Sequence, residues 1–116
     1  MTNPQTFLPL PPVTFHILVA LAAGDRHGYA IMQDVAASTG GHVQLGAGTL
    51  YRSIQRMVEQ GLVVESRHRP PAGQDDERRR YYRLTTLGVS VARLETERLA
   101  AAVRVARAAG LAPGRA

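Results

Sequence analysis

The alternation of apolar and polar positions along the chain predicts four helices and one β-hairpin. The first helix is apolar on nearly all sides and ends at Gly24, which is typical of a helix that packs on several neighbours. Glycines also follow the second and third helices, where they favour a helix end. The predicted helices span residues 13–23, 29–38, the stretch from a turn and cap at 46–49 to Gln60, and 85–109. Residues 1–7 are expected to form a loose leader.

Between the third and fourth helices the pattern changes to alternation, which indicates strands. Residues 62–69 and 78–85 flank the polar stretch "PPAGQDDE" and are expected to pair as a β-hairpin. The predicted fold is therefore mainly α with a small β-hairpin, in the order of a winged helix-turn-helix domain with one added C-terminal helix. We expect residues 1–84 to form the winged helix-turn-helix domain and residues 85–116 to form a dimerisation helix and tail.

The third helix has an apolar side and a polar side when its residues are placed about 100° apart around the axis. The apolar side holds Leu50, Ile54, Met57 and Val58, and the polar side holds Thr49, Arg52, Ser53, Arg56 and Gln60. Such a polar side can be merely solvated. Here it carries two Arg residues, has no acidic residue in its first two turns and precedes an Arg-rich hairpin, so a DNA-reading face is favoured. This pattern nominates Ser53 and Arg56 as DNA contacts.

The predicted hairpin concentrates positive charge. Its arginines are Arg67, Arg69, Arg78, Arg79, Arg80 and Arg83. In a wing, such side chains lie along the DNA backbone or enter the minor groove, although a solvated loop in which the acids of residues 75–77 pair with them is the alternative. Tyr81 and Tyr82 should point to opposite faces of their strand, one inward and one outward.

The last helix carries an apolar stripe that is too long for so small a domain to bury. We expect it to pair with a second copy, and a helix folded back on its own domain is the alternative. The candidate dimer-interface residues are Leu87, Val91, Leu94, Arg98, Leu99, Ala102 and Val105.

Composition narrows the classes of function. The formal net charge is +5, all 14 basic residues are Arg, and the chain has no Cys. The four His residues show no metal-binding spacing and no nucleophile motif is present, so we expect neither an enzyme nor a cofactor. The apolar run "FHILVALAAG" is interrupted by His16 and is too short for a membrane span, which favours a core helix in a cytoplasmic protein.

Three stretches resemble the signature blocks of the PadR family of bacterial transcriptional regulators: "HGYAIMQDV", "GAGTLYRSIQRMVEQGLV" and "RRRYYRLTTLG". The length resembles the short subfamily with a single C-terminal helix. The resemblance implies a homodimeric winged-helix repressor of a palindromic operator in double-stranded DNA, with its third helix in the major groove, and release by a small-molecule effector. It implies contacts from Thr49, Tyr51 and Arg52 in the GTLYR block. From the HGY and RRYY blocks it adds Tyr29, Arg80 and Tyr82.

A winged helix used only to bind other proteins is the alternative function, since a fold does not determine a function. Such modules tend to replace the basic face of the third helix with apolar or acidic residues, whereas Arg52 and Arg56 are present here. The chain has no Trp, and no aromatic residue lies in its last predicted helix, which departs from family members that stack aromatic drugs.

Overall fold

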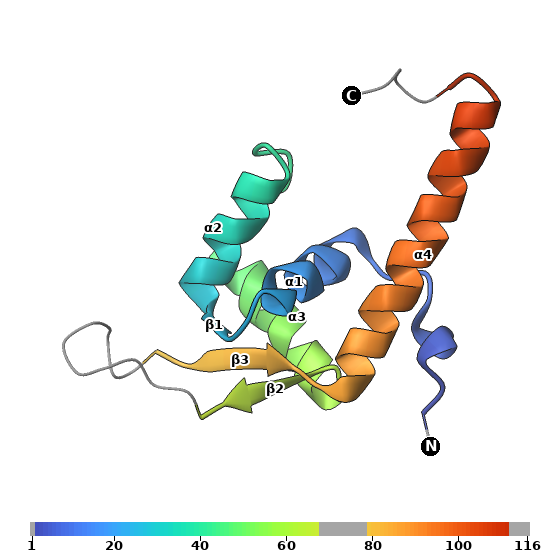
Figure 1. The fold of residues 1–116 in the computed structure, drawn as a ribbon. Helices are drawn as coiled ribbons and strands as arrows, with labels where there is room; N and C mark the ends of the chain where they lie inside the picture. The colour runs from blue at the N-terminus through green and yellow to red at the C-terminus, as the bar shows by residue number, and fades with distance from the viewer. Residues whose placement is uncertain (1, 68–78, 112–116) are drawn as a thin grey trace.

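A computed structural model describes residues 2–67 and 79–111. The elements are η1 (Pro4–Phe7), α1 (Pro12–Ala22), β1 (Arg26–His27), α2 (Gly28–Ser38), α3 (Ala47–Glu59), β2 (Val63–Ser66), β3 (Tyr81–Leu84) and α4 (Thr86–Ala108). Figure 1 shows α1 at the centre, with α2 and α3 on one side, the sheet along its edge and α4 rising on the other side. The predicted winged helix-turn-helix fold is confirmed.

Helix α1 is the centre of the core, as its apolar sequence predicts. Ile17 and Leu18 are completely buried, and α2, α3, α4 and β3 all pack against this helix. Pro12 occupies its first turn, where a missing backbone N–H costs no hydrogen bond. A helix that is apolar all round thus acquires neighbours on several sides.

Helix α3 begins at Ala47, within the stretch 46–49 that was predicted as a turn and cap. Gly46 is its N-cap with extended dihedral angles, and Gly48 and Thr49 lie in the first turn. At the other end Gly61 has a φ of 81°. The Leu62 N–H donates to the Met57 carbonyl at 2.9 Å and the Gly61 N–H to the Val58 carbonyl at 3.1 Å, which is a Schellman termination.

The sheet has three strands in the order β1-β3-β2, all antiparallel. The predicted hairpin is present, with Val63 opposite Leu84 and Ser66 opposite Tyr81. The sequence did not predict strand β1, because its two residues are too few to show a period. It pairs with β3 and joins the start of α2 to the hairpin.

Both tyrosines of β3 are buried, so the prediction that one of them points outward is wrong. Tyr81 is 9% exposed and Tyr82 is 7% exposed. Tyr82 belongs to the main core, and the ring of Tyr81 packs edge-on against His27 with centroids 5.3 Å apart. Side chains of neighbouring elements therefore cover both faces of this central strand.

The first half of α4 packs on the domain. Thr85 caps the helix by accepting a hydrogen bond from the Gly88 N–H at 3.0 Å, and Val91 is completely buried. The N-terminal segment also packs along α4, as Figure 1 shows, and contains the 3₁₀ turn η1. The prediction of a loose leader over residues 1–7 is therefore corrected for the described residues 2–7, because α4 supplies a surface for them to pack on.

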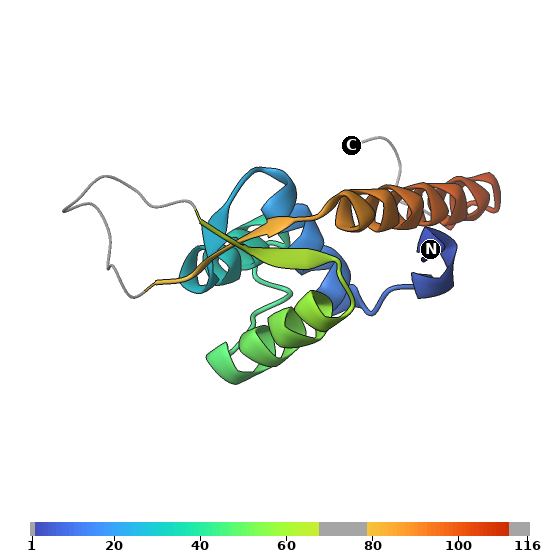
Figure 2. The same ribbon diagram turned by 90° about the horizontal axis from the view of Figure 1, so that it is seen from below.

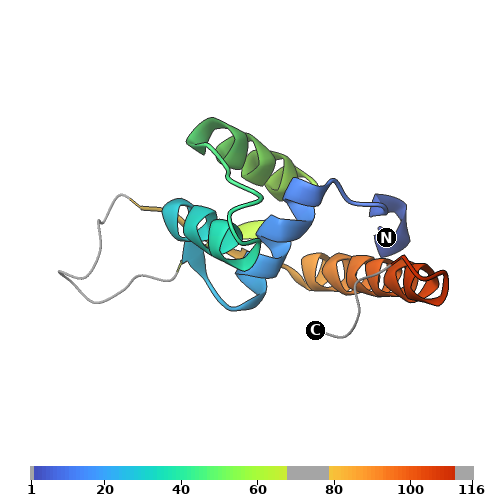
Figure 3. The ribbon, with the colours of Figure 1, turned by 90° about the horizontal axis from the view of Figure 1, so that it is seen from above.

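The second half of α4 extends away from the domain (Figures 2 and 3). Val103 is 44% exposed and Val105 is 69% exposed there. Among the described residues, no helix is long and apolar enough to cross a membrane.

Candidate nucleic-acid interface

Helix α3 is attached to the domain by one side only. Leu50, Ile54 and Met57 are at most 2% exposed, whereas Thr49, Arg52 and Arg56 are exposed. Neither Arg52 nor Arg56 forms an ion pair with a described residue. The polar side predicted from the sequence is therefore present at the surface, with both guanidinium groups available to a ligand.

The beginning of α3 is open. No side chain caps it, and a Cβ atom built on Gly46 would meet nothing within 4 Å. The first backbone N–H groups of a helix have no partner within the helix and carry a partial positive charge. An anion such as a phosphate can be bound at this end.

Tyr51 leaves α3 toward the first residue of α2. A Cβ atom built on Gly28 would overlap the hydroxyl end of the Tyr51 ring, so only glycine leaves room for this contact. Tyr51 nevertheless remains 48% exposed, and Tyr29 beside Gly28 is 54% exposed. The HGY and GTLY stretches, distant in sequence, thus form one surface.

The hairpin joins this surface through His27. The His27 Nδ1 atom accepts a hydrogen bond from the Ala30 N–H at 3.1 Å, which caps α2, and its Nε2 atom lies 3.1 Å from Nη1 of Arg79. Arg80 is 72% exposed at its side chain and lies 3.9 Å from Glu65, a distance and exposure at which an ion pair contributes little stability. Arg78 lies outside the described residues.

The structure corrects the prediction that Tyr82 lies at the DNA-binding surface. Its side chain lies in the core, and burial raises its pKa, with a further increase from the Glu65 carboxylate and from Tyr51. Tyr82 therefore supports the strand and the residues beside it. The first turns of α2 and α3 and the outer ends of β2 and β3 lie at one end of the molecule (Figures 1 and 2).

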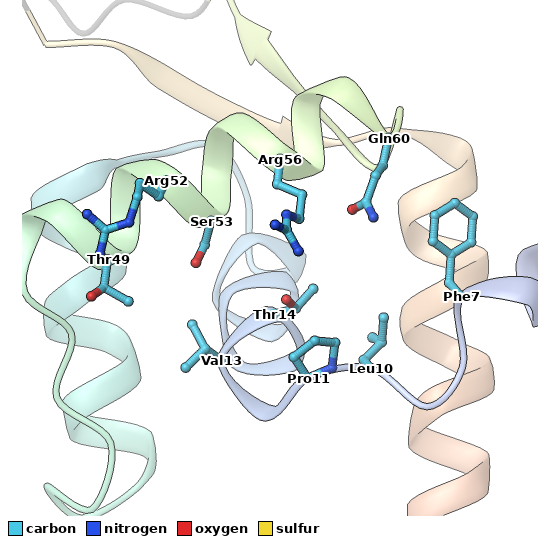
Figure 4. A pocket seen from close by; sticks show the side chains of 10 residues that line it. All are labelled: Phe7, Leu10, Pro11, Val13, Thr14, Thr49, Arg52, Ser53, Arg56 and Gln60. Atoms are coloured by element: carbon cyan, nitrogen blue, oxygen red, sulfur yellow. The ribbon is translucent and has the colours of Figure 1, made fainter.

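A groove runs along the polar side of α3, and we call it the α3 groove (Figure 4). Its volume is about 350 Å³. It is lined by Thr49, Arg52, Ser53, Arg56 and Gln60 of α3 and by Phe7, Leu10, Pro11, Val13 and Thr14 of the N-terminal segment and the first turn of α1. The pattern of α3 predicted the first five residues. Nothing in the sequence predicted the other five, which approach α3 only through the packing of α1.

A second, larger groove of about 840 Å³ lies between α1, β3 and α4. Val19, Ala22 and Ala92 supply apolar surface, and Val19 is 43% exposed. Arg83 and Arg93 also line it. The exposed face of α1 thus continues into a surface of α4.

The residues predicted for the dimer interface differ in exposure. Leu87 packs against the core and Val91 is completely buried, so the prediction that Val91 contacts a second copy is corrected. Leu94 and Leu99 are half-buried. Ala102 and Val105 are exposed on the extended part of α4.

Arg98, the remaining residue of that set, forms an ion pair within its own helix. Its Nε and Nη2 atoms both donate to the carboxylate of Glu95 at 2.7 Å. This bidentate bond is the main reason that the pKa of Glu95 lies below its ordinary value, and a hydrogen bond from the Leu10 backbone lowers it further. Glu95 is 2% exposed, so the ion pair supplies a partner to a buried carboxylate. The sequence pattern placed Arg98 in the dimer interface and did not predict this ion pair.

No group of three or more metal-binding side chains is present among the described residues.

The profile of the PadR-like transcriptional regulator family matches residues 17–95, which is more than half of the chain. The chain belongs to this family. An uncharacterised protein from Lysinibacillus sphaericus is 36% identical over 72 residues, which span 62% of this chain and 63% of that protein.

Solved structures have the same fold. A transcriptional regulator from Clostridium thermocellum has a TM-score of 0.66 at 26% identity, with 82% of this chain and 89% of that chain covered. A PadR family regulator from Clostridium difficile has a TM-score of 0.69 at 22% identity, with 84% and 96% covered. Bacillus subtilis PadR, solved in complex with operator DNA, has a TM-score of 0.60 at 20% identity, with 73% and 46% covered.

Proposed function

We propose that this PadR-like protein is a homodimeric, sequence-specific repressor that binds double-stranded DNA and is released by a small-molecule effector. The observation that carries the proposal is the exposed basic side of α3, which stands beside the open start of that helix and the arginines of the hairpin. Counterion release from DNA phosphates makes such a surface a strong binder of the duplex.

Helix α3 enters the major groove in this proposal. Arg52 and Arg56 bind guanine edges or phosphates, and Thr49 and Ser53 reach partners at shorter range. Tyr51 and Tyr29 donate their hydroxyl groups to the phosphate backbone beside the groove. Arg79 and Arg80, with Arg78 of the undescribed loop, bind the flanking minor groove.

The dimer forms through the extended part of α4. Ala102 and Val105 are exposed there, and the groove beside Val19 offers an apolar surface that the described residues leave uncovered. A helix from a second copy can cover this surface, which two-fold symmetry would repeat on the partner. The two α3 helices would then read half-sites about one DNA turn, roughly 34–36 Å, apart in a palindromic operator.

The relatives support DNA as the partner. Bacillus subtilis PadR was solved with operator DNA, and it shares this chain's winged-helix fold. The basic side of α3 favours the same class of partner for this chain over a protein partner, because protein-binding winged helices tend to lose that charge.

The test measures, by fluorescence anisotropy at several salt concentrations, how the purified protein binds the promoter region of its own gene. We expect tighter binding than to a shuffled duplex of equal length and composition. The logarithm of the binding constant should fall with the logarithm of salt concentration by about 0.9 for each phosphate neutralised. Equal, weak binding to both duplexes would first lead to a genome-wide DNA selection. If that selection also showed no preference for any sequence, a protein-interaction module would be favoured.

A further inference from the structure

We propose that the α3 groove binds an amphipathic anion, an acid group carried on an apolar chain, and that the bound anion excludes DNA. The inference deepens the proposed function, because it assigns the effector a site and a chemical class. It rests on the two contrasting walls of the groove and on the position of Arg56 between them.

The wall formed by α3 is cationic and rich in hydrogen-bond donors. Figure 4 shows Ser53, Arg56 and Gln60 pointing from α3 toward the start of α1. Arg52 and Arg56 have no acidic partner among the described residues, and none of the ten lining residues, all of them described, is Asp or Glu. A single acid group placed there would receive charge-assisted hydrogen bonds without competition from a carboxylate among the lining residues.

The opposite wall is mainly apolar, and Thr14 is its polar residue. Figure 4 shows Val13 across from Ser53, Thr14 and Pro11 across from Arg56, and Leu10 and Phe7 on the side of Gln60. This wall is held in place, because Leu10 is 7% exposed and belongs to the hydrophobic core. An apolar chain attached to the acid group would therefore find a preformed surface.

The size of the groove suits a small ligand. Its volume of about 350 Å³ lies at the lower end of the range of small-molecule sites, roughly 300–1,000 Å³. A DNA phosphate would use the guanidinium groups but leave the apolar wall unfilled.

The consequence for DNA follows from shared atoms. Arg52 and Arg56 are proposed to contact DNA, and a guanidinium group that holds the anion cannot make the same hydrogen bonds to a base or phosphate. The bound chain would also fill the space along α3. Ligand and operator should therefore compete directly, without a change of the fold.

The experiment first measures the ligand alone, by calorimetry on the full chain without DNA. The probes are butanoate, hexanoate and octanoate below their aggregation limits, with octylammonium as the charge-reversed control. We expect the carboxylates to bind, each added methylene to tighten binding by about fourfold until the wall is filled, and octylammonium to bind much more weakly. Equal binding of octanoate and octylammonium, or no binding of octanoate, would overturn the proposal.

Variants locate the site. Arg56→Ala should weaken octanoate binding by about tenfold, and Val13→Thr, which keeps the shape but reduces the apolar surface, should weaken it by less. Arg93→Ala is the matched control, since it removes an arginine from the second groove. Loss of binding in Arg93→Ala with normal binding in Arg56→Ala would place the anion in the second groove and overturn the proposal. Thermal melting of each variant, with Arg56→Lys as a milder change, excludes loss of folding as the cause.

Competition is measured last, with octanoate added to the complex of the protein with its operator. We expect octanoate to raise the apparent Kd for DNA as a competitor does, by an amount set by the octanoate concentration relative to the Kd of octanoate for the protein. Octanoate bound at Arg56 without any effect on DNA binding would overturn the shared-arginine mechanism. If the protein binds no DNA, the proposed function fails, whereas the calorimetric result on the groove stands by itself.

Discussion

The ring of Tyr51 lies against the Cα atom of Gly28, at a place where any Cβ atom would overlap its hydroxyl end. This contact joins the start of α2 to the exposed flank of α3. Since Tyr51 remains 48% exposed, the contact orients the ring at the surface without removing it from solvent. The pair therefore links a backbone requirement to the geometry of the proposed DNA-binding surface.

Replacement of Gly28 by Ala should displace Tyr51 and weaken operator binding by about three- to tenfold, the loss of one hydrogen bond. Stability should change by less than about 1 kcal/mol, because the exposed ring can rotate away and Ala favours a helix. Fluorescence anisotropy measures the affinity. In the double variant Gly28→Ala/Tyr51→Ala, affinity should equal that of Tyr51→Ala alone, and a further decrease would mean that Gly28 acts elsewhere.

Replacement of Gly88 by Ala should lower the free energy of unfolding by about 1–3 kcal/mol or more. A Cβ atom there would overlap the backbone carbonyl oxygen of Leu62, which cannot rotate away as a side chain can. Urea denaturation measures the change. Gly48→Ala is the control in the first turn of α3, where the nearest atom is a flexible Arg52 nitrogen at 3.3 Å, and it should be neutral or stabilising.

Removal of Arg52 or Arg56 should weaken operator binding by about tenfold or more, because each side chain is proposed to form a charge-assisted hydrogen bond with DNA. If the removed arginine neutralises a phosphate, the salt slope should also decrease by about 0.9. Arg104→Ala makes the same change of charge on the extended part of α4 and should leave both quantities unchanged. Native affinity in both α3 variants would remove this face from the interface.

Replacement of Glu95 by Gln should lower the Tm at neutral pH by several degrees, because the bidentate bond to Arg98 requires the carboxylate. The pKa of Glu95 is lowered in the folded protein, so its contribution is fully present above the ordinary pKa of 4.5 and is lost as the pH falls through the lowered value. The Tm of the native chain should therefore approach that of the variant in acid. Melting curves across this pH range test the convergence, and Glu97→Gln, an exposed carboxylate nearby, should leave the profile unchanged.

Replacement of Val105 by Asp should shift the protein from dimer to monomer and weaken binding to a palindromic operator. Val105 is 69% exposed, and a charge at this position would have to lose its water in the proposed interface. Sedimentation equilibrium measures the assembly. Ala100→Asp adds the same charge on the opposite side of the helix and should leave the dimer intact; a monomeric native chain would contradict the proposal.

Patterns within single elements were sufficient to predict much of this protein. Glycines and caps marked the ends of the helices, and the two sides of α3 followed from the spacing of Leu50, Ile54 and Met57. These features are local, since helical periodicity and the conformations open to glycine depend on residues close in sequence. The PadR resemblance, carried by three such stretches, was confirmed by the family match.

Only the tertiary structure decided which surfaces meet. From the sequence, Tyr82 was predicted to contact DNA and Val91 to contact a second copy. Both are buried, because other elements pack over β3 and the first half of α4. The α3 groove brings Phe7 near Gln60, and the N-terminal turn η1 packs against α4. Such contacts join residues far apart in the chain, so they follow from the packing of whole helices and from no local period. The amino-acid pattern thus determined which face of α3 is polar, and the packing of α1 and α4 determined what that face lies against.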